Sequence, residues 1–191
     1  MKTFISSGFT ILLCLSIFSS TAQNMGDFTG IKVSDPIIIV ISQSDENSIK
    51  VDGPGNIQEQ IKTKSDGEVL EISVDGKIKS EKPVIVSIGI KSLKSMDISG
   101  AAEVKSGNQL NCDKLSIESS GAGDINIELK ANEIKAKIGG AGDVKLKGAT
   151  QEIDATITGA GELKAFALEA NKAKVKVSGA GNAKINVVQS L

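Results

Sequence analysis

Acidic residues recur directly after small-residue triplets along the second half of the chain. Four Gly-Ala-Gly or Gly-Ala-Ala triplets are followed by Glu103, Asp124, Asp143 and Glu162, and Asn182 follows a fifth. Asp124, Asp143 and Glu162 are 19 residues apart, so a repeat of that length stacks their side chains along one edge. Stacked carboxylates repel unless a cation or water lies between them. The spacing therefore predicts a cation site, with calcium as the ion; the alternative is a row of solvated turn acids and no cofactor.

The triplets themselves repeat with a period near 20. The first Gly of each falls at 100, 121, 140, 159 and 179, and a fixed period of this length indicates a solenoid whose coils pack only on their neighbours. Glycine is expected at such a corner because it adopts positive φ. Ala is expected to fit the inside of the corner, and the acid to accept hydrogen bonds from nearby backbone N–H groups. The predicted structural turn residues are Gly100, Gly121, Gly123, Gly140, Gly142, Gly159, Gly161, Gly179 and Gly181.

The elements that position these corners are strands, because the apolar residues between them alternate with period two. In the coil that begins at Asp124, apolar residues alternate over 125–129 and again over 134–138, and a turn is expected at 130–132. The sequence therefore predicts an all-β fold. We expect a parallel β-helix-like solenoid of about 19–21 residues per coil, with two short strands and two turns in each, apolar rows inside and polar rows outside.

Stacking the coils on their glycines predicts three ladders of side chains. The first is nearly all amide, the second alternates in charge, and the third is uniformly small. Opposite charges on adjacent strands attract, and a uniformly small row assigns its cysteine a structural role rather than a reactive one. The three ladders are Asp113, Asn132, Gln151 and Asn171; Lys135, Asp154 and Lys174; and Cys112, Ala131, Thr150 and Ala170.

The composition excludes several classes of site. The chain has no His, Trp, Tyr or Arg, which excludes a His-based catalytic triad, a His-liganded zinc site and an arginine clamp. The net charge of −1 lacks the excess of basic residues that is typical of nucleic-acid-binding proteins. Five Phe are the only aromatic residues, so the core must consist of Ile, Val, Leu and Ala.

The first residues resemble an export signal. Lys2 precedes an apolar stretch over 8–18, and small residues at 20 and 22 suit a cut before Gln23. We therefore expect a signal peptide at 1–22 and no transmembrane segment in the mature chain. Residues 23–191 are expected to form one domain, with an irregular β segment at 23–98 and regular repeats at 99–191.

These features together resemble a known family. The signal peptide, "FTGIKVSDPIIIVISQ", "GEVLEISVDG" and the serial "SGAGD"-like turns are similar to the head GIN domain family of auto-transporter adhesins, secreted proteins common in Bacteroidetes. The resemblance implies a right-handed parallel β-helix-like fold, export and adhesion, and it brings no catalytic residues. Family members usually run through one more Gly-rich coil to a Tyr-x-Gly-x-Pro motif, and this chain has no Tyr. With no polar capping coil before Leu191, we expect exposed strand edges and self-association or docking there.

The favoured function is an exported, non-catalytic binding module. It would act as an adhesin for a polysaccharide or a cell-surface protein, in the periplasm, on the outer surface or outside the cell. One alternative is a structural or assembly component of the cell envelope that docks through exposed strand edges. A polysaccharide lyase or hydrolase is the least supported alternative, because the acids are regularly spaced rather than clustered with a distinct partner. Lys145, Lys164 and Lys184 lie two positions beyond Asp143, Glu162 and Asn182. They are expected to form either a solvated face or a contact for an acidic glycan.

Overall fold

The computed structural model describes residues 27–77 and 83–188, so the predicted signal peptide at 1–22 lies outside the described residues. Strands dominate: the described residues form one 13-stranded sheet. In chain order they are β1 (Gly30–Val33), β2 (Ile38–Gln43), β3 (Ser48–Asp52), β4 (Ile61–Asp66), β5 (Val69–Val74), β6 (Ile85–Ile90), β7 (Ser95–Ile98), β8 (Glu103–Ser106), β9 (Leu110–Ser119), β10 (Asp124–Ile138), β11 (Val144–Ile157), β12 (Glu162–Val177) and β13 (Asn182–Val187).

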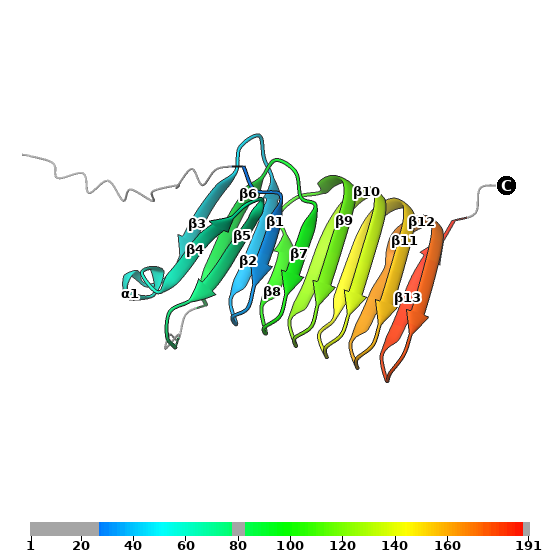
Figure 1. Cartoon of the computed structure of the whole chain (residues 1–191). Helices are drawn as coiled ribbons and strands as arrows, with labels where there is room; N and C mark the ends of the chain where they lie inside the picture. The colour runs from blue at the N-terminus through cyan, green and yellow to red at the C-terminus, as the bar shows by residue number, and fades with distance from the viewer. Residues whose placement is uncertain (1–26, 78–82, 189–191) are drawn as a thin grey trace, which may run out of the picture.

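The strands stack side by side as the coils of a solenoid (Figure 1). One face, called here the first face, consists of β6, β2, β8, the first halves of β10, β11 and β12, and β13. The second face consists of β5, β1, β7, most of β9 and the second halves of β10 to β12. Except at β3 and β4 all these pairs are parallel. The predicted all-β parallel solenoid is confirmed.

The register between coils follows the glycine spacing. Ile125 pairs with Val144, and Val144 pairs with Leu163. The charge ladder is confirmed by the pairs Lys135–Asp154 and Asp154–Lys174, and the small-residue ladder by the pairs Cys112–Ala131, Ala131–Thr150 and Thr150–Ala170. Inward side chains of β10 and β11 are buried, because a coil on either side covers their apolar rows, whereas Val175 and Val177 at the end of β12 are exposed.

The expected turn at 130–132 is wrong. β10 runs unbroken from Asp124 to Ile138, and β11 and β12 also pass from the first face to the second without a break. Pairing continues to Ala131, omits Asn132 and resumes at Glu133. Each regular coil therefore has one sharp corner, at the small-residue triplet, and one gradual bend, where the backbone stays extended.

The N-terminal end is irregular, as expected, and its order is not sequential. β1 and β2 lie between the later β5 and β6 and the still later β7 and β8. β3 and β4 then pair antiparallel with β6 and β5 and form the outer edge. A short helical turn, α1 (Gly55–Gln58), separates β3 from β4. No helix within 27–77 or 83–188 is long and apolar enough to cross a membrane.

One coil is longer than its neighbours because of a bulge. The pairing of β11 with β12 shifts between Lys145 and Lys147, so that Ala165 and Phe166 stand where β11 has one residue. The spacing from Gly159 to Gly179 is accordingly 20 rather than 19. Phe166 points away from the core with 74% of its surface exposed.

A hydroxyl interrupts an otherwise aliphatic inner row. Ser119 is paired with Ile98 on one side and Ile138 on the other, and it is 1% exposed. Its Oγ has no hydrogen-bond partner among the described residues. A buried hydroxyl without a partner loses its hydration and gains nothing in return.

We predict that Ser119→Ala raises the free energy of unfolding by about 1 kcal/mol, because it removes this desolvated hydroxyl without adding volume. Urea denaturation of the two proteins measures the difference. Ser120→Ala, at the exposed neighbouring position, is the control and should leave the midpoint unchanged. A lower midpoint for Ser119→Ala would show that the hydroxyl has a partner and contradict the prediction.

Candidate functional site

The small-residue corners stack on one another through backbone hydrogen bonds. The Ala122 N–H donates to the Gly100 carbonyl at 3.1 Å, and Ala141 and Ala160 donate to Gly121 and Gly140 at 3.0 Å. The corner of each coil therefore lies directly on the corner of the coil before it. The result is a straight ridge that runs along the solenoid and carries the predicted turn glycines.

Close approach rather than positive φ explains most of these glycines. Among the corner glycines only Gly179 has a positive φ, of 146°, so the expectation of positive φ at every corner is wrong. A Cβ on Gly121 or Gly140 would instead collide with the carbonyl oxygen of the first Gly in the preceding coil. The expectation that Ala fills the inside of the corner is also wrong, because Ala122 and Ala141 are exposed at its tip.

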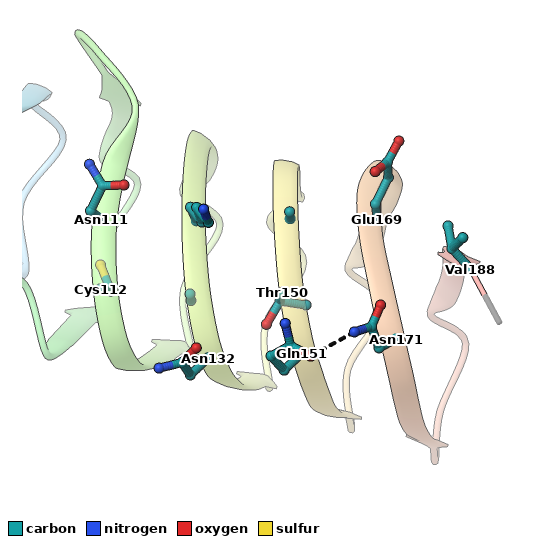
Figure 2. Close-up of a pocket in the computed structure, with 11 residues that line it drawn as sticks. Asn111, Cys112, Asn132, Thr150, Gln151, Glu169, Asn171 and Val188 are labelled. Carbon is teal, nitrogen blue, oxygen red and sulfur yellow. Dashed lines mark hydrogen bonds between the residues drawn. The ribbon is translucent and has the colours of Figure 1, made fainter. Parts of the chain in front are cut away.

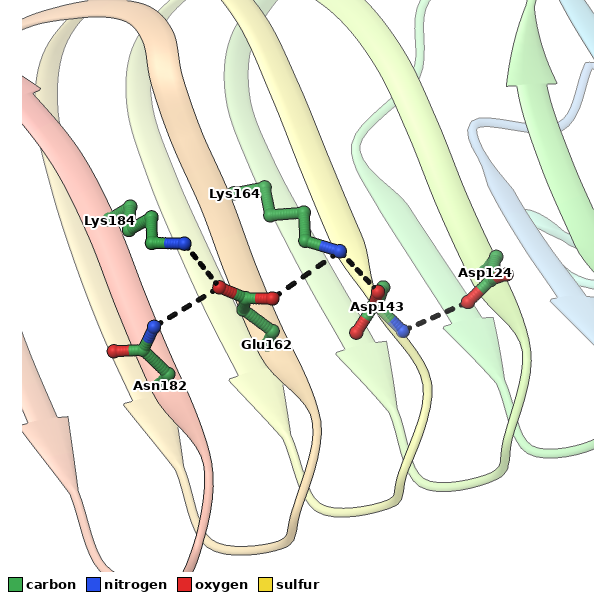
Figure 3. Close-up of polar contacts among 6 residues, drawn as sticks. All are labelled: Asp124, Asp143, Glu162, Lys164, Asn182 and Lys184. Carbon is green, nitrogen blue, oxygen red and sulfur yellow. Dashed lines mark hydrogen bonds and ion pairs between the residues drawn. The ribbon is translucent and has the colours of Figure 1, made fainter.

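The acid row lies beside this ridge, at the start of the first-face strands (Figure 3). Asp124 Oδ1 accepts a hydrogen bond of 3.0 Å from the backbone N–H of Asp143 in the next coil. Lys164 Nζ lies 2.6 Å from Asp143 Oδ2 and 3.3 Å from Glu162 Oε2. Glu162 Oε1 also contacts Lys184 Nζ and Asn182 Nδ2, each at 3.1 Å. Asp124 thus accepts a backbone hydrogen bond, but the bond joins neighbouring coils, whereas a bond that closes the turn of its own coil was expected.

The Lys164 ammonium group lies between the Asp143 and Glu162 carboxylates, where repulsion between the acids was expected. The hydrogen bond from Lys184, with further help from Lys164 and Asn182, lowers the pKa of Glu162. The hydrogen bond to Asp143, followed by that to Glu162, raises the pKa of Lys164. Both shifts favour the charged forms, so Asp143, Lys164, Glu162 and Lys184 form an alternating charged chain along the first face.

The predicted cation site at Asp124, Asp143 and Glu162 stays a prediction. Within residues 27–77 and 83–188, no three His, Cys, Asp or Glu side chains are grouped so that they could hold a metal ion. Lys164 already lies between two of the three carboxylates. A bound calcium ion would have to displace this ammonium group, and thermal melting in calcium and in chelator tests whether it does.

The ion pairs of Glu162 predict a pH dependence of stability. Because the folded pKa of Glu162 is lowered, this group stabilises the fold above the ordinary glutamate pKa of about 4.3, and the contribution is lost as the pH falls through the folded value. We expect Glu162→Gln to lower the melting temperature near pH 7 and to have little effect near pH 3. Glu128→Gln is the control, because the exposed Glu128 carboxylate makes no ion pair with any described residue. An equal loss at both pH values would contradict the assignment.

A shallow groove follows the gradual bend on the other side of the solenoid (Figure 2). It has a volume of about 370 Å³, and its floor includes the small ladder residues Cys112, Ala131 and Thr150. Three members of the amide ladder, Asn132, Gln151 and Asn171, also line the groove. In the ladder, Asn132 Nδ2 donates to Asp113 Oδ1 at 2.7 Å and Asn171 Nδ2 donates to Gln151 Oε1 at 2.6 Å. The predicted amide ladder is confirmed at these two contacts. Lys130 and Glu169 add charges to the rim.

Comparisons with known proteins identify the family. The family model described as "Putative auto-transporter adhesin, head GIN domain" matches residues 27–191. The chain belongs to the head GIN domain family. The resemblance seen in the sequence is thereby confirmed, and an adhesin family is the class of protein to which the chain is assigned.

Solved structures share the fold of this head GIN domain. A "putative adhesin" from Parabacteroides distasonis has a TM-score of 0.67 at 23% identity, with 86% of this chain and 79% of that chain covered. One from Parabacteroides merdae has a TM-score of 0.64 at 24% identity, with coverages of 86% and 79%. One from Bacteroides fragilis has a TM-score of 0.58 at 19% identity, with coverages of 87% and 95%. A search of curated proteins gives no significant match.

Cys112 of the head GIN domain is half-buried at the floor of the groove. Burial raises the pKa of the Cys112 thiol to about 11, so the reactive thiolate is scarce at neutral pH. The structural role predicted for Cys112 from its small-residue ladder is consistent with this environment. Cys112 pairs with Ala131, and Ala131 pairs with Thr150, so the small-residue ladder is continuous across these three coils.

One charged cluster on the second face was not predicted from the sequence. Glu133 accepts contacts from Lys114 at 2.8 Å and from Lys135 at 3.1 Å. The hydrogen bond from Lys114 is the main cause of the lowered pKa of Glu133. These residues border a second hollow of about 370 Å³. Lys114 and Glu133 are 19 residues apart. The same 19-residue spacing that aligned the other ladders would therefore have predicted this pair.

Proposed function

We propose that this head GIN domain is an exported, non-catalytic adhesin that binds a repetitive polysaccharide or a protein at a cell surface. The observation that carries the proposal is the amide ladder along the groove at the gradual bend. Its side chains repeat at the spacing between stacked strands, about 4.8 Å. A polymer with a regular repeat would meet the same groups at each step.

The chemistry of the ladder suits hydroxyl-rich ligands. Each amide has two N–H donors and a carbonyl acceptor with two lone pairs. The contacts between Asn132 and Asp113 and between Asn171 and Gln151 use part of this capacity. Asn132, Gln151 and Asn171 are exposed and line the groove, so their remaining donors and acceptors are accessible to sugar hydroxyls. The regular distribution of acids and the absence of His, Arg and Tyr favour binding over catalysis.

A glycan array probed with residues 23–191, in calcium and in chelator, tests the proposal. Glycan binding that is lost in Asn132→Ala/Gln151→Ala assigns the groove as the site. Binding lost in Asp124→Asn/Asp143→Asn and in chelator assigns the acid row and its cation instead. Glu118→Gln, exposed on the second face, is the control. No binding to any glycan by a folded protein would overturn recognition of a polysaccharide and leave a protein ligand.

Export to the periplasm, the outer surface or the medium is part of this proposal, supported by the signal-like sequence at 1–22 and by the adhesin family. An assembly role is the second candidate. The observation in its favour is that Val175 and Val177 of β12 are exposed among the described residues.

A further inference from the structure

The bulge in β12 presents one aromatic side chain to solvent on the first face. Phe166 is 74% exposed, whereas Phe28, the other phenylalanine within the described ranges, is 1% exposed. The bulge leaves the inner row intact, since Ala165 before it and Leu168 after it are fully buried. β-Bulges often re-aim a side chain next to a functional site, so this ring is a candidate contact for a ligand.

The exposure of Phe166 does not come from a missing neighbour in the sheet. β11 and β13 pair with β12 on its two sides. Side chains alternate between the two sides of a strand, so Phe166 points outward like Lys164, two residues earlier, while Ala165 points inward. The ring therefore stands on the outer surface of the solenoid, where stacked coils do not cover it.

A row of lysines crosses the first face just before the bulge. Lys145 of β11, Lys164 of β12 and Lys184 of β13 lie opposite one another on adjacent strands. Like charges in this arrangement repel. The carboxylates of Asp143 and Glu162 offset the repulsion at Lys164 and Lys184, with contacts of 2.6 to 3.3 Å (Figure 3). A carboxylate is therefore the anion that this row already binds within the fold.

Two ammonium groups beside the bulge have no such carboxylate. Neither Lys145 nor Lys147 forms an ion pair with another residue in 27–77 or 83–188. Lys147 pairs with Ala167, the residue after Phe166. On its other side Lys147 pairs with Glu128 in the strand ladder, and their side chains form no ion pair. An external carboxylate would find two unpaired ammonium groups next to an exposed ring.

A sugar that carries a carboxylate fits both features of this surface. The C–H face of a sugar ring is apolar and stacks on an aromatic ring, and its carboxylate forms charge-assisted hydrogen bonds with ammonium groups. A membrane fits less well, because binding in its interface needs an extended apolar face, and Phe166 stands among lysines. A polymer of such sugars would also follow the lysine row across strands about 4.8 Å apart.

We propose that Phe166, Lys145 and Lys147 form a subsite for a uronic acid unit of an acidic polysaccharide. The Phe166 ring stacks on the sugar, and the two ammonium groups bind its carboxylate. This inference rests on the proposed function, because the ligand is again a polysaccharide. It adds the charge of the ligand and a contact on the first face, since none of the three residues lines the groove.

Polygalacturonate, alginate and hyaluronate test the subsite, each compared with the form whose carboxylates are methyl esters. We expect residues 23–191 to bind at least one of the acids, with an affinity that falls as salt rises, and to bind its ester at least about tenfold more weakly. Phe166→Ala and Lys145→Gln/Lys147→Gln should each weaken binding by at least about tenfold. Phe166→Tyr keeps the ring and should bind as the unchanged protein does.

A matched variant and a melting curve exclude general causes of lost binding. Lys137→Gln/Lys176→Gln removes two exposed charges from the second face and should leave binding unchanged. Phe166→Ala should melt at the same temperature as the unchanged protein, because most of the ring is exposed. Equal losses in the two double-lysine variants would overturn the subsite and show a general attraction between charges.

The remaining outcomes separate failure of the subsite from failure of the proposed function. Glycan binding that is the same for acid and ester, or unchanged in Phe166→Ala, overturns the subsite and leaves the proposed polysaccharide adhesin intact. If the folded protein binds no polysaccharide, charged or neutral, both proposals fail. Phe166-dependent binding to phosphatidylglycerol vesicles, without binding to any acidic polysaccharide, would overturn the subsite in favour of a membrane surface.

Discussion

Gly140→Ala is expected to lower the free energy of unfolding by about 3 kcal/mol or more, a large effect for a single methyl group. The added Cβ would collide with the Gly121 carbonyl oxygen. That oxygen accepts the 3.0 Å hydrogen bond from the Ala141 N–H, so it cannot move away without breaking the contact between coils. In a domain of this size the loss corresponds to about 6–12 °C in melting temperature.

Gly139→Ala is the matched control, one residue earlier in the same corner. A Cβ there would lie 3.6 Å from Thr158 Oγ1 and 3.8 Å from the Ser119 carbonyl oxygen, which are ordinary contacts. The neighbouring coils already carry Ser120 and Thr158 at this position. We expect no loss, or a gain of about 0.5 kcal/mol from a less flexible unfolded chain. Equal melting temperatures for Gly139→Ala and Gly140→Ala would contradict the prediction. They would show that the coils can move apart at the corner to admit the added methyl group without loss of stability.

The coil register could be predicted because it depends only on periods that the sequence displays. A period of two places residues inside or outside, and the 19-residue spacing then fixes which side chains are neighbours. Ladders such as Cys112–Ala131–Thr150 and Lys135–Asp154 followed directly. No long-range information was needed, since each coil contacts only the coils on either side.

The corners could not be predicted in the same detail because they depend on distances between backbones. Glycine has two uses, positive φ and close approach, and one sequence does not distinguish them. The close approach at Gly121 and Gly140 follows from the hydrogen bonds between corners. The unbroken bend at Asn132 was missed for a similar reason, since a polar residue between two apolar runs suits a turn and an extended bend equally.

The N-terminal order was also beyond the sequence. β1 and β2 are inserted between strands that follow them in the chain, and no repeat marks this rearrangement. Antiparallel β3 and β4 close that end, whereas 171–177 at the other end stay open among the described residues.

This difference between the covered and uncovered coils leads to the second large effect. Ile138→Ala should lower the free energy of unfolding by about 3 kcal/mol, because it leaves a cavity between coils that are packed on both sides. Val177→Ala removes a side chain from the same inner row where 45% of it is already exposed, and the expected loss is below about 1 kcal/mol.

Urea denaturation of Ile138→Ala and Val177→Ala measures the two losses of unfolding free energy. We expect them to differ because the two coils are covered differently, not because the deleted side chains differ. Ile138→Ala removes one methylene more than Val177→Ala. One methylene accounts for about 0.8 kcal/mol, which is less than the expected difference between the two losses of unfolding free energy. Similar losses in both variants would mean that the Val177 row is covered in solution, by a second copy or by other residues. A small loss at Val177 would instead agree with the 45% exposure of this side chain.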